Sequence, residues 1–365
     1  MELNYRWKLA DAYFPKNKGK VFSCFACGGG STMGYKLAGF DVVGFLEIDK
    51  RMADMYTKNH NPKYAFIEGI QTFKDRTDLP AELFELDILD GSPPCSSFSM
   101  SGNREKDWGK EKKFSEGQSL QVLDTLFYDF IDLAEKLQPK VVVAENVTGI
   151  LKGNAREYVR KVINEFDKAG YLVQEFELDS SQMGVPQKRE RVFFIAVRKD
   201  LVERLPGPVG LLFSEFPNLN LKFGRMPIPF DEIRTVGLND TGWTDHDQYI
   251  WDRRVIGDRK YSDVLIRVQG RNSNFNSSFI YPNKPVPTLA SSEGSKYVLF
   301  DEPRKMNSTE MKLSQSFPLD YDFGSQKSSK IQYVLGMSVP PLMMAQLSSR
   351  IRNEWSAIFD NSKTL

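Results

Sequence analysis

Cys95 is the most prominent reactive group of the sequence, because two prolines fix the backbone directly before its thiol. Residues 91–95 read GSPPC and follow an apolar run that is typical of a buried strand. A thiolate held rigidly at the end of a strand can attack carbon and form a covalent intermediate. The alternative is a buried cysteine with a structural role only.

A carboxylate and two guanidinium groups accompany other predicted strands. Glu145 ends a β-branched strand, and the segment QKRER, with Gln187, Arg189 and Arg191, precedes the apolar run 193–197. The alternation of side chains along a strand puts these three residues on one face. Two guanidinium groups there can bind a phosphate, orient a carboxylate or hydrogen-bond a base oxygen. The alternative is a ladder of surface charges on an edge strand.

A glycine cluster indicates a nucleotide-like ligand. Residues 25–30 read FACGGG between a predicted strand and helix, and Glu47 ends the next strand about 20 residues later. Glycines let the backbone approach a ligand closely, and a carboxylate at that position can bind two ribose hydroxyls. The cluster is not G-x-G-x-x-G, and no Gly-Lys-Ser/Thr is present to hold phosphates. The alternative is a tight turn without a ligand.

Strands that alternate with helices must position these groups. The pattern predicts an α/β fold, a doubly wound and mostly parallel sheet, in which ligands bind at the carboxyl ends of the strands. The predicted strands cover 21–26, 40–48, 86–89, 141–144 and 193–197, and helical spacing covers 120–137 and 341–359. Residues 200–285 are rich in Pro, Gly, Asn and Arg, with strand-like pieces such as 264–268. They predict a smaller, loop-rich module.

The composition excludes several classes of protein. The chain has 365 residues, with 49 Lys and Arg against 48 Asp and Glu, which suits one large domain and a smaller one. Three cysteines at uneven spacing do not form a disulfide framework, and two histidines cannot build a histidine-rich metal site. The N-terminus lacks an apolar signal core, and no run is long enough to span a membrane. We therefore expect a cytoplasmic protein without a metal.

Taken in order, these blocks resemble the C5-cytosine-specific DNA methyltransferase family, of the bacterial or phage modification type. The matching blocks are residues 25–30, Glu47, Pro94-Cys95, Glu145-Asn146-Val147, QKRER at 187–191, EMKLSQSFP at 310–318 and GMSVPP at 336–341. The resemblance implies a Rossmann-like fold that uses S-adenosylmethionine. It also implies a catalytic and cofactor-binding domain at 1–199, a target-recognition domain at 200–325, and a C-terminal segment at 326–365 that returns to the catalytic domain.

The resemblance implies a mechanism as well. Cys95 would add to C6 of a cytosine flipped out of double-stranded DNA, and C5 would then accept the methyl group. Glu145 would contact N3 and the exocyclic amine of the base. Arg189 and Arg191 would hold the O2 side of the base and order Glu145 or its loop.

The same carry-over predicts two sets of binding residues. For the cofactor these are Phe25, Ala26, Cys27, Gly28, Glu47, Ile48, Ile70, Pro94, Leu126, Ser338 and Val339. For DNA they are Ser99, Lys110, Lys112, Gln187, Arg253, Arg254, Arg259, Arg267, Gln269 and Arg271. Three residues depart from the family pattern: Cys27 in place of a glycine, Gly69 in place of an aspartate, and Met337 in place of an asparagine.

Other functions remain open at this stage. A related enzyme methylates cytosine in transfer RNA, although its variants near the nucleophile are missing here. A DNA-binding homologue without catalysis is a second alternative. A nicotinamide oxidoreductase would leave the Pro-Pro-Cys and arginine blocks unexplained. We expect a monomer, and a restriction endonuclease that acts on the same DNA site would be its partner.

Overall fold

The computed structural model of the chain describes most of its residues in two compact units. The described ranges are 4–94, 111–112, 121–122, 125–153, 155–207, 216–236, 242–271, 277–292, 294–325 and 327–360. The sheet unit comprises Tyr13–Leu178, Glu190–Lys222 and Met344–Leu365, and the mixed unit comprises Met1–Ala12, Asp179–Arg189 and Phe223–Met343. The division at 1–199 and 200–325 assigns a catalytic role and a DNA-recognition role to parts of the chain. These roles stay predictions.

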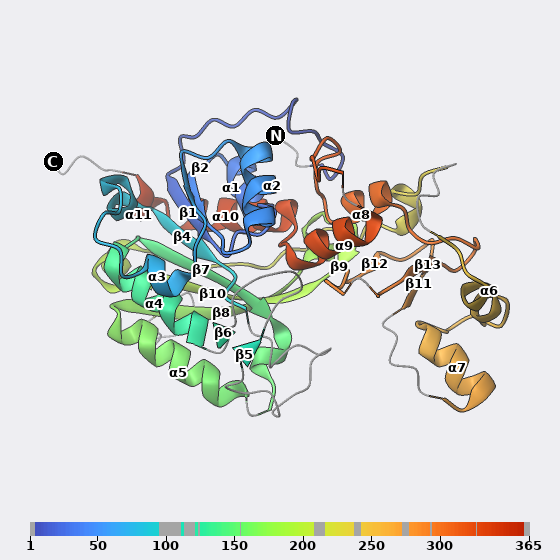
Figure 1. The fold of residues 1–365 in the computed structure, drawn as a ribbon. Helices are drawn as coiled ribbons and strands as arrows, with labels where there is room; N and C mark the ends of the chain where they lie inside the picture. The colour runs from blue at the N-terminus through green and yellow to red at the C-terminus, as the bar shows by residue number, and fades with distance from the viewer. Residues whose placement is uncertain are drawn as a thin grey trace. The chain divides into compact units, whose positions relative to one another are not determined.

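A seven-stranded sheet forms the centre of the sheet unit (Figure 1). Its strand order is β3-β2-β1-β4-β7-β10-β8, and β1 pairs in parallel with both β2 and β4, whereas β7 and β10 are antiparallel. The strands are β1 Lys20–Cys24, β2 Asp41–Leu46, β3 Tyr64–Phe66, β4 Ile88–Gly91, β7 Val141–Val147, β8 Tyr171–Asp179 and β10 Glu190–Arg198. The predicted α/β fold with a mostly parallel sheet is confirmed.

Helices cover both faces of this sheet, with α4 and α5 on one side and α1 and α2 on the other (Figure 1). The helices of the unit are α1 Gly30–Leu37, α2 Lys50–His60, α3 Ile70–Phe73, α4 Leu126–Leu137, α5 Ala155–Lys168 and α11 Ser356–Phe359, and α10 Pro341–Glu354 runs on from the mixed unit. Short 3-10 turns lie at Ala81–Glu85, Thr148–Leu151 and Lys199–Arg204. Alternate strand residues pack against α3, α4 and α5 in one apolar core, which explains why the central strands read as apolar runs.

The mixed unit contains short elements. Its helices are α6 Asp245–Asp252, α7 Tyr261–Gln269, α8 Ser308–Ser314 and α9 Ser328–Met337, with 3-10 turns at Ser180–Met183 and Phe230–Glu232. Two small parallel pairs join β11 Ser278–Ile280 with β13 Tyr297–Leu299, and β9 Gln187–Lys188 with β12 Val286–Pro287. A further pair, β5 Glu111–Lys112 and β6 Gln121–Val122, belongs to the sheet unit.

The prediction of a strand-like piece at 264–268 is wrong, because these residues lie in helix α7. The Asp263 carboxylate accepts hydrogen bonds from the backbone N–H groups of Arg259 and Lys260 before the first turn. Tyr261, Val264 and Leu265 are buried at the spacing of a helix, and the helix ends at Gly270 with φ 65°. The β-branched residues misled the prediction, since tertiary packing outweighs their propensity.

No helix among the described residues is long and apolar enough to cross a membrane.

Candidate functional site

The turn after β1 has an unusual backbone that is set against Glu47. Phe25, Cys27 and Gly29 all have positive φ, at 53°, 46° and 78°. The N–H of Cys27 donates to one carboxylate oxygen of Glu47 at 2.8 Å, and the N–H of Asp49 donates to the other at 2.9 Å. Glu47 is buried, and that burial raises the pKa of its carboxyl group. Each oxygen still has a lone-pair direction for a further donor.

Gly29 leaves space for His60. A Cβ at this position would lie 2.3 Å from His60 Nε2, and its φ of +78° also disfavours any other residue. The His60 ring packs edge-on against Tyr56, and burial lowers the pKa of His60 to about 3. The neutral His60 imidazole therefore packs directly against Gly29 of the glycine turn.

Apolar residues at the same sheet edge complete this region. Phe25 is half-buried and lies 6.3 Å from the Phe130 ring, and Ile70 and Leu126 are buried. A Cβ built on Gly69 would lie 3.6 Å from Ile48 Cδ1, so the two segments are in contact. Phe25, Ile48 and Ile70 follow the carboxyl ends of β1, β2 and β3, and Leu126 begins α4. The carboxyl ends of the strands are where the fold predicts a ligand.

Two predicted cofactor residues belong to the other unit. Ser338 ends α9, where its hydroxyl donates to the Val334 carbonyl at 2.8 Å, and Val339 is buried next to it. Their roles stay predictions.

Glu145 at the end of β7 is paired with Arg191 of β10. Arg191 Nε lies 2.8 Å from Glu145 Oε1, and both side chains are largely buried. Burial lowers the pKa of Arg191. The next residue, Asn146, donates from Nδ2 to the Pro93 carbonyl at 3.2 Å. The carboxylate strand is thus tied to the loop that leads to Cys95, which itself lies outside the described residues.

Arg189 and Gln187 are more buried than the predicted strand face implied. Arg189 is 2% exposed and Gln187 is 0% exposed. Arg189 lies between β9 and β10, where the strand is interrupted. The Arg189 guanidinium donates to the carbonyls of Leu289 at 3.4 Å and Gly336 at 2.9 Å. The Gln187 carboxamide has no hydrogen-bond partner among the described residues. Arg189 therefore holds the β12 side of the mixed unit to the end of α9.

Asp90 is a buried carboxyl group that sequence reasoning missed. It is 2% exposed in β4, and it accepts hydrogen bonds from the Ser23 hydroxyl at 2.8 Å and the Tyr35 hydroxyl at 3.2 Å. Ser23 precedes the glycine turn and Tyr35 follows it. Burial is the main cause that raises the pKa of Asp90 to about 7, and the charge of Glu145 adds to it. Its place inside the run ILDGSPP would signal only a buried strand, so no local pattern reveals it.

The predicted DNA-binding residues are placed unevenly. Ser99 and Lys110 lie outside the described residues, and Lys112 belongs to β5 without a described side chain. In the mixed unit, Arg254 and Arg267 are engaged internally: Arg254 lies over the Trp251 ring, and Arg267 pairs with Asp258 at 2.6 Å. Arg253, Arg259, Gln269 and Arg271 are exposed. Arg253 also donates to the Tyr249 carbonyl at 3.1 Å, and Gln269 donates to the Tyr249 hydroxyl at 3.2 Å.

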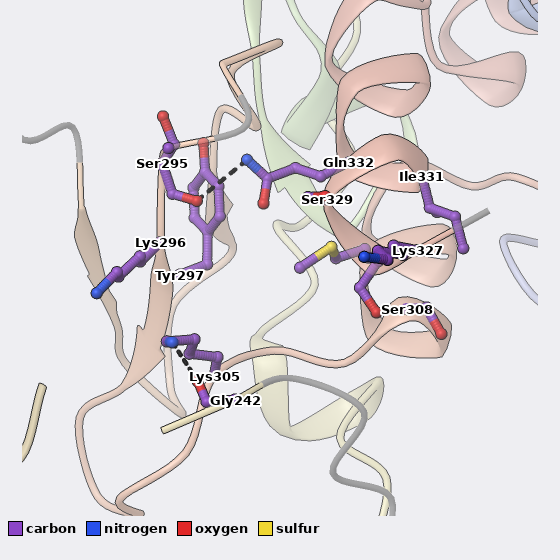
Figure 2. A pocket seen from close by; sticks show the side chains of 13 residues that line it. Gly242, Ser295, Lys296, Tyr297, Lys305, Ser308, Lys327, Ser329, Ile331 and Gln332 are labelled. Atoms are coloured by element: carbon purple, nitrogen blue, oxygen red, sulfur yellow. Dashed lines mark hydrogen bonds between the residues drawn. The ribbon is translucent and has the colours of Figure 1, made fainter. Parts of the chain in front are cut away.

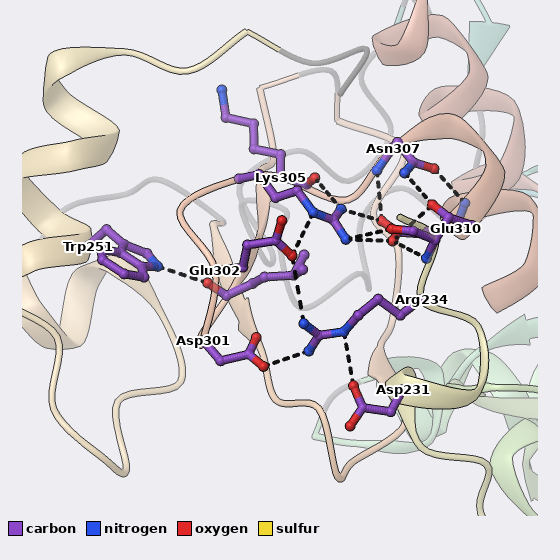
Figure 3. A network of polar contacts seen from close by, with 11 residues as sticks. Asp231, Arg234, Trp251, Asp301, Glu302, Lys305, Asn307 and Glu310 are labelled. Carbon is purple, nitrogen blue, oxygen red and sulfur yellow. Dashed lines mark hydrogen bonds and ion pairs between the residues drawn. The ribbon is translucent and has the colours of Figure 1, made fainter. Parts of the chain in front are cut away.

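A polar network around Glu310 organises the mixed unit (Figure 3). Glu310 is fully buried and binds the Arg304 guanidinium through both oxygens, each at 2.8 Å. It also accepts from the backbone N–H of Thr235 at 2.9 Å and forms a capping box with Asn307 at the start of α8. The motif that begins at Glu310 thus joins segments that are 75 residues apart in the sequence.

A cavity of about 580 Å³ lies between β13, α8 and α9 (Figure 2). Three lysines line it, together with serine hydroxyls and Gln332, and no carboxylate occurs among the described residues of its lining. Two of these lysines, Lys296 and Lys305, pair with the buried Asp247 at 2.6 and 3.0 Å. The cavity therefore has a basic and hydroxyl-rich lining. The described residues contain no group of three or more His, Cys, Asp or Glu that could hold a metal.

Comparison with known sequences identifies a family for this chain. Residues 19–353 match the model of C-5 cytosine-specific DNA methylases. The chain is 28% identical over 379 residues to the Type II methyltransferase M.DdeI of Desulfomicrobium norvegicum, covering 91% of this chain and 88% of the relative. It is 37% identical over 225 residues to the Type II methyltransferase M.FnuDI of Fusobacterium nucleatum, covering 61% of this chain and 55% of the relative.

Solved structures show the same fold. A protein described as a DNA modification methyltransferase encoded within an E. coli prophage superposes with a TM-score of 0.65 and 20% identity, covering 92% of this chain and 99% of the other. A DNMT2 variant from Spodoptera frugiperda gives a TM-score of 0.61 and 16% identity, with 93% and 99% covered. At these identities the likeness concerns the fold alone.

Proposed function

Because the chain belongs to the C-5 cytosine-specific DNA methylase family, and is thus a DNA cytosine-5 methyltransferase, we propose that Cys95 is its nucleophile and Glu145 the group that activates the base. The observation that supports this assignment is the pairing of Glu145 with Arg191, next to the Asn146 contact with the Pro-Pro-Cys loop. These contacts order a carboxylate beside the segment that carries the thiol.

The chain's own groups account for the steps at the base. The Cys95 thiolate adds to C6, a Cys–C6 bond forms, and electron density moves onto C5. Glu145 stabilises the charge that develops at N3 and the exocyclic amine. Once C5 carries the methyl group, its proton is lost and the Cys–C6 bond breaks, which regenerates the thiolate. Since none of these atoms can be reached in a stacked duplex, the cytosine is flipped out.

S-adenosylmethionine fits the glycine turn as the methyl donor. Glu47 presents two oxygens, each fixed by one backbone N–H, and two adjacent ribose hydroxyls are the donors that this arrangement suits. Phe25, Ile48 and Ile70 offer apolar surface for the adenine ring. The cofactor would supply a methyl group on an electrophilic sulfonium. We assign the remaining contacts to Ala26, Cys27, Gly28, Pro94, Leu126, Ser338 and Val339.

The arginines have positioning roles in this proposal. Arg191 holds the Glu145 carboxylate in place through its Nε contact. Arg189 is buried on the carbonyls of Leu289 and Gly336, so it orders the segment around the end of α9. The O2 side of the base remains a predicted contact for this pair.

Double-stranded DNA is the proposed substrate, and the exposed arginines of the mixed unit are the candidate contacts. Relatives named Type II methyltransferases support a restriction endonuclease with the same target as a partner. A cytoplasmic monomer remains our prediction.

One experiment distinguishes the proposed function from two alternatives, a transfer RNA methyltransferase and a DNA-binding homologue without catalysis. The protein is incubated with S-adenosylmethionine labelled in its methyl group, together with duplex DNA and, separately, transfer RNA. Label in 5-methylcytosine of DNA supports the proposal, and label only in transfer RNA would select the RNA enzyme. DNA binding without label in either nucleic acid would select the non-catalytic homologue. Sequencing the methylated positions then gives the target site.

A further inference from the structure

The turn between α6 and α7 presents apolar side chains to solvent. Val255 is 49% exposed and Ile256 is 90% exposed. Single exposed apolar residues are common on protein surfaces, so exposure alone carries no meaning. This turn is distinguished by how firmly the residues around Ile256 are held.

Hydrogen bonds from the turn itself fix its backbone. The Asp258 carboxylate accepts from the N–H of Val255 at 2.7 Å, and the Asp258 N–H donates to the Val255 carbonyl at 3.1 Å. Gly257, with φ 106°, donates its N–H to the Tyr281 hydroxyl, which in turn donates to the Asp258 carbonyl at 2.8 Å. Ile256 thus lies at the tip of a turn that needs little further ordering to bind a partner.

Side chains below the turn brace it against the small sheet of this unit. Tyr281 stacks on Phe300, with ring centroids 4.4 Å apart and planes at 17°. Arg254 lies 3.3 Å above the Trp251 ring and donates to the Phe300 carbonyl. Arg267 binds Asp258 and the Arg253 carbonyl. Arg254 and Arg267 are therefore part of the support and have little capacity left for a ligand.

The charge of the segment favours a polyanion. Residues 251–271 contain six basic and three acidic side chains. Two of the acids are used internally, because Asp258 pairs with Arg267 and Asp263 caps α7. Arg253 and Arg259 remain exposed on either side of Val255 and Ile256. Arg253 also donates to the Tyr249 carbonyl at 3.1 Å and lies 3.8 Å from the centroid of the Tyr249 ring, which fixes its position. An apolar tip between two exposed guanidinium groups matches a DNA groove, where phosphates flank the base edges.

We propose that this turn, residues 252–260, contacts base edges of duplex DNA. Ile256 packs against the C5-methyl group of a thymine in the major groove, which is the apolar group that base edges offer there. Arg253 and Arg259 bind the flanking phosphates. This inference rests on the proposed function of the protein as a methyltransferase of duplex DNA.

The test compares methylation of a randomised duplex library by the wild-type protein and by Ile256→Ala. The variant should lose preference at one thymine-containing base pair, and replacing that thymine with uracil should lower wild-type methylation by about tenfold. Arg259→Ala should lower the slope of log affinity against log salt by about 1 without changing the preference. Met226→Ala is the matched control, since Met226 is 84% exposed in the same unit. Thermal melting confirms that each variant is folded.

The outcomes separate this inference from the proposed function. A wild-type protein that methylates no duplex DNA would refute the proposed function itself. If the wild type methylates a defined site and Ile256→Ala keeps the full preference, the base-contacting role of the turn is wrong. A preference that relaxes at a pair without thymine would refute the methyl contact.

Discussion

Arg191 and Glu145 are diagonal neighbours on the antiparallel strands β10 and β7, with arginine Nε 2.8 Å from a carboxylate oxygen. A buried carboxylate that loses its partner is left uncompensated, and this costs roughly 3 kcal/mol. The pair therefore fixes the position of the group that we assign to the base.

Arg191→Ala should lower kcat by about 100-fold, because the carboxylate would no longer be held where charge develops. Arg191→Lys keeps the charge but has a different shape, and it should recover only part of this loss. The affinity for S-adenosylmethionine, measured by calorimetry, should stay within about twofold of the wild type, since Glu47 follows β2 and not β7 or β10. An equal loss of cofactor binding in both variants would mean that Arg191 acts through general stability.

Cys27 and Gly29 should respond in opposite ways to exchange of their side chains. Cys27 already has φ 46°, and it is its backbone N–H that reaches Glu47, so Cys27→Gly should preserve cofactor binding and relieve strain of about 1 kcal/mol. Gly29→Ala would place a Cβ 2.3 Å from His60 Nε2 and should weaken cofactor binding strongly. Calorimetric titration of both variants checks this. Loss of binding in Cys27→Gly would contradict it.

Much of this site could be predicted from the sequence, and the reasons differ between its parts. The strands that carry Glu47 and Glu145 have strong apolar runs, and the positions of these carboxylates at strand ends follow from the fold class. Asp90 could not be found in this way, because its partners Ser23 and Tyr35 come from β1 and α1.

The segment 251–271 is harder to predict. Its arginines look alike in the sequence, and only the contacts of Arg253, Arg254 and Arg267 show that these three also support the turn. Helix α7 was missed because its β-branched residues resemble a strand, while the burial of Val264 and Leu265 follows a helix.

Glu47→Gln should weaken the binding of S-adenosylmethionine more than the binding of DNA. The amide retains one acceptor oxygen, so one of the two backbone N–H groups and one ribose hydroxyl lose their acceptor, and Kd should rise by about tenfold. Asp54→Asn on the exposed face of α2 is the control and should leave both affinities unchanged. Equal weakening of DNA binding in Glu47→Gln would contradict the cofactor role.

Asp90→Asn should make stability less dependent on pH. The folded protein raises the pKa of Asp90 to about 7, above its ordinary value of 3.8. The folded state thus favours the protonated carboxyl group, so this stabilisation is fully present at low pH and is lost as pH rises through 7. The free energy of unfolding of the wild type should fall by about 1 kcal/mol from this group between pH 6 and pH 8. Urea titration should show that Asp90→Asn lacks this decrease, and an identical decrease in the variant would exclude Asp90 as its source.

The bond between Cys95 and cytosine C6 is tested most directly by trapping it. A duplex that carries 5-fluorocytosine at the mapped target is incubated with the protein and S-adenosylmethionine, then denatured and digested for mass spectrometry. Fluorine at C5 cannot leave as a proton does, so the adduct should persist on the peptide that contains Cys95, and Cys95→Ser should form none. Methylation of ordinary cytosine at this site without any trapped adduct, or an adduct on another residue, would contradict the account.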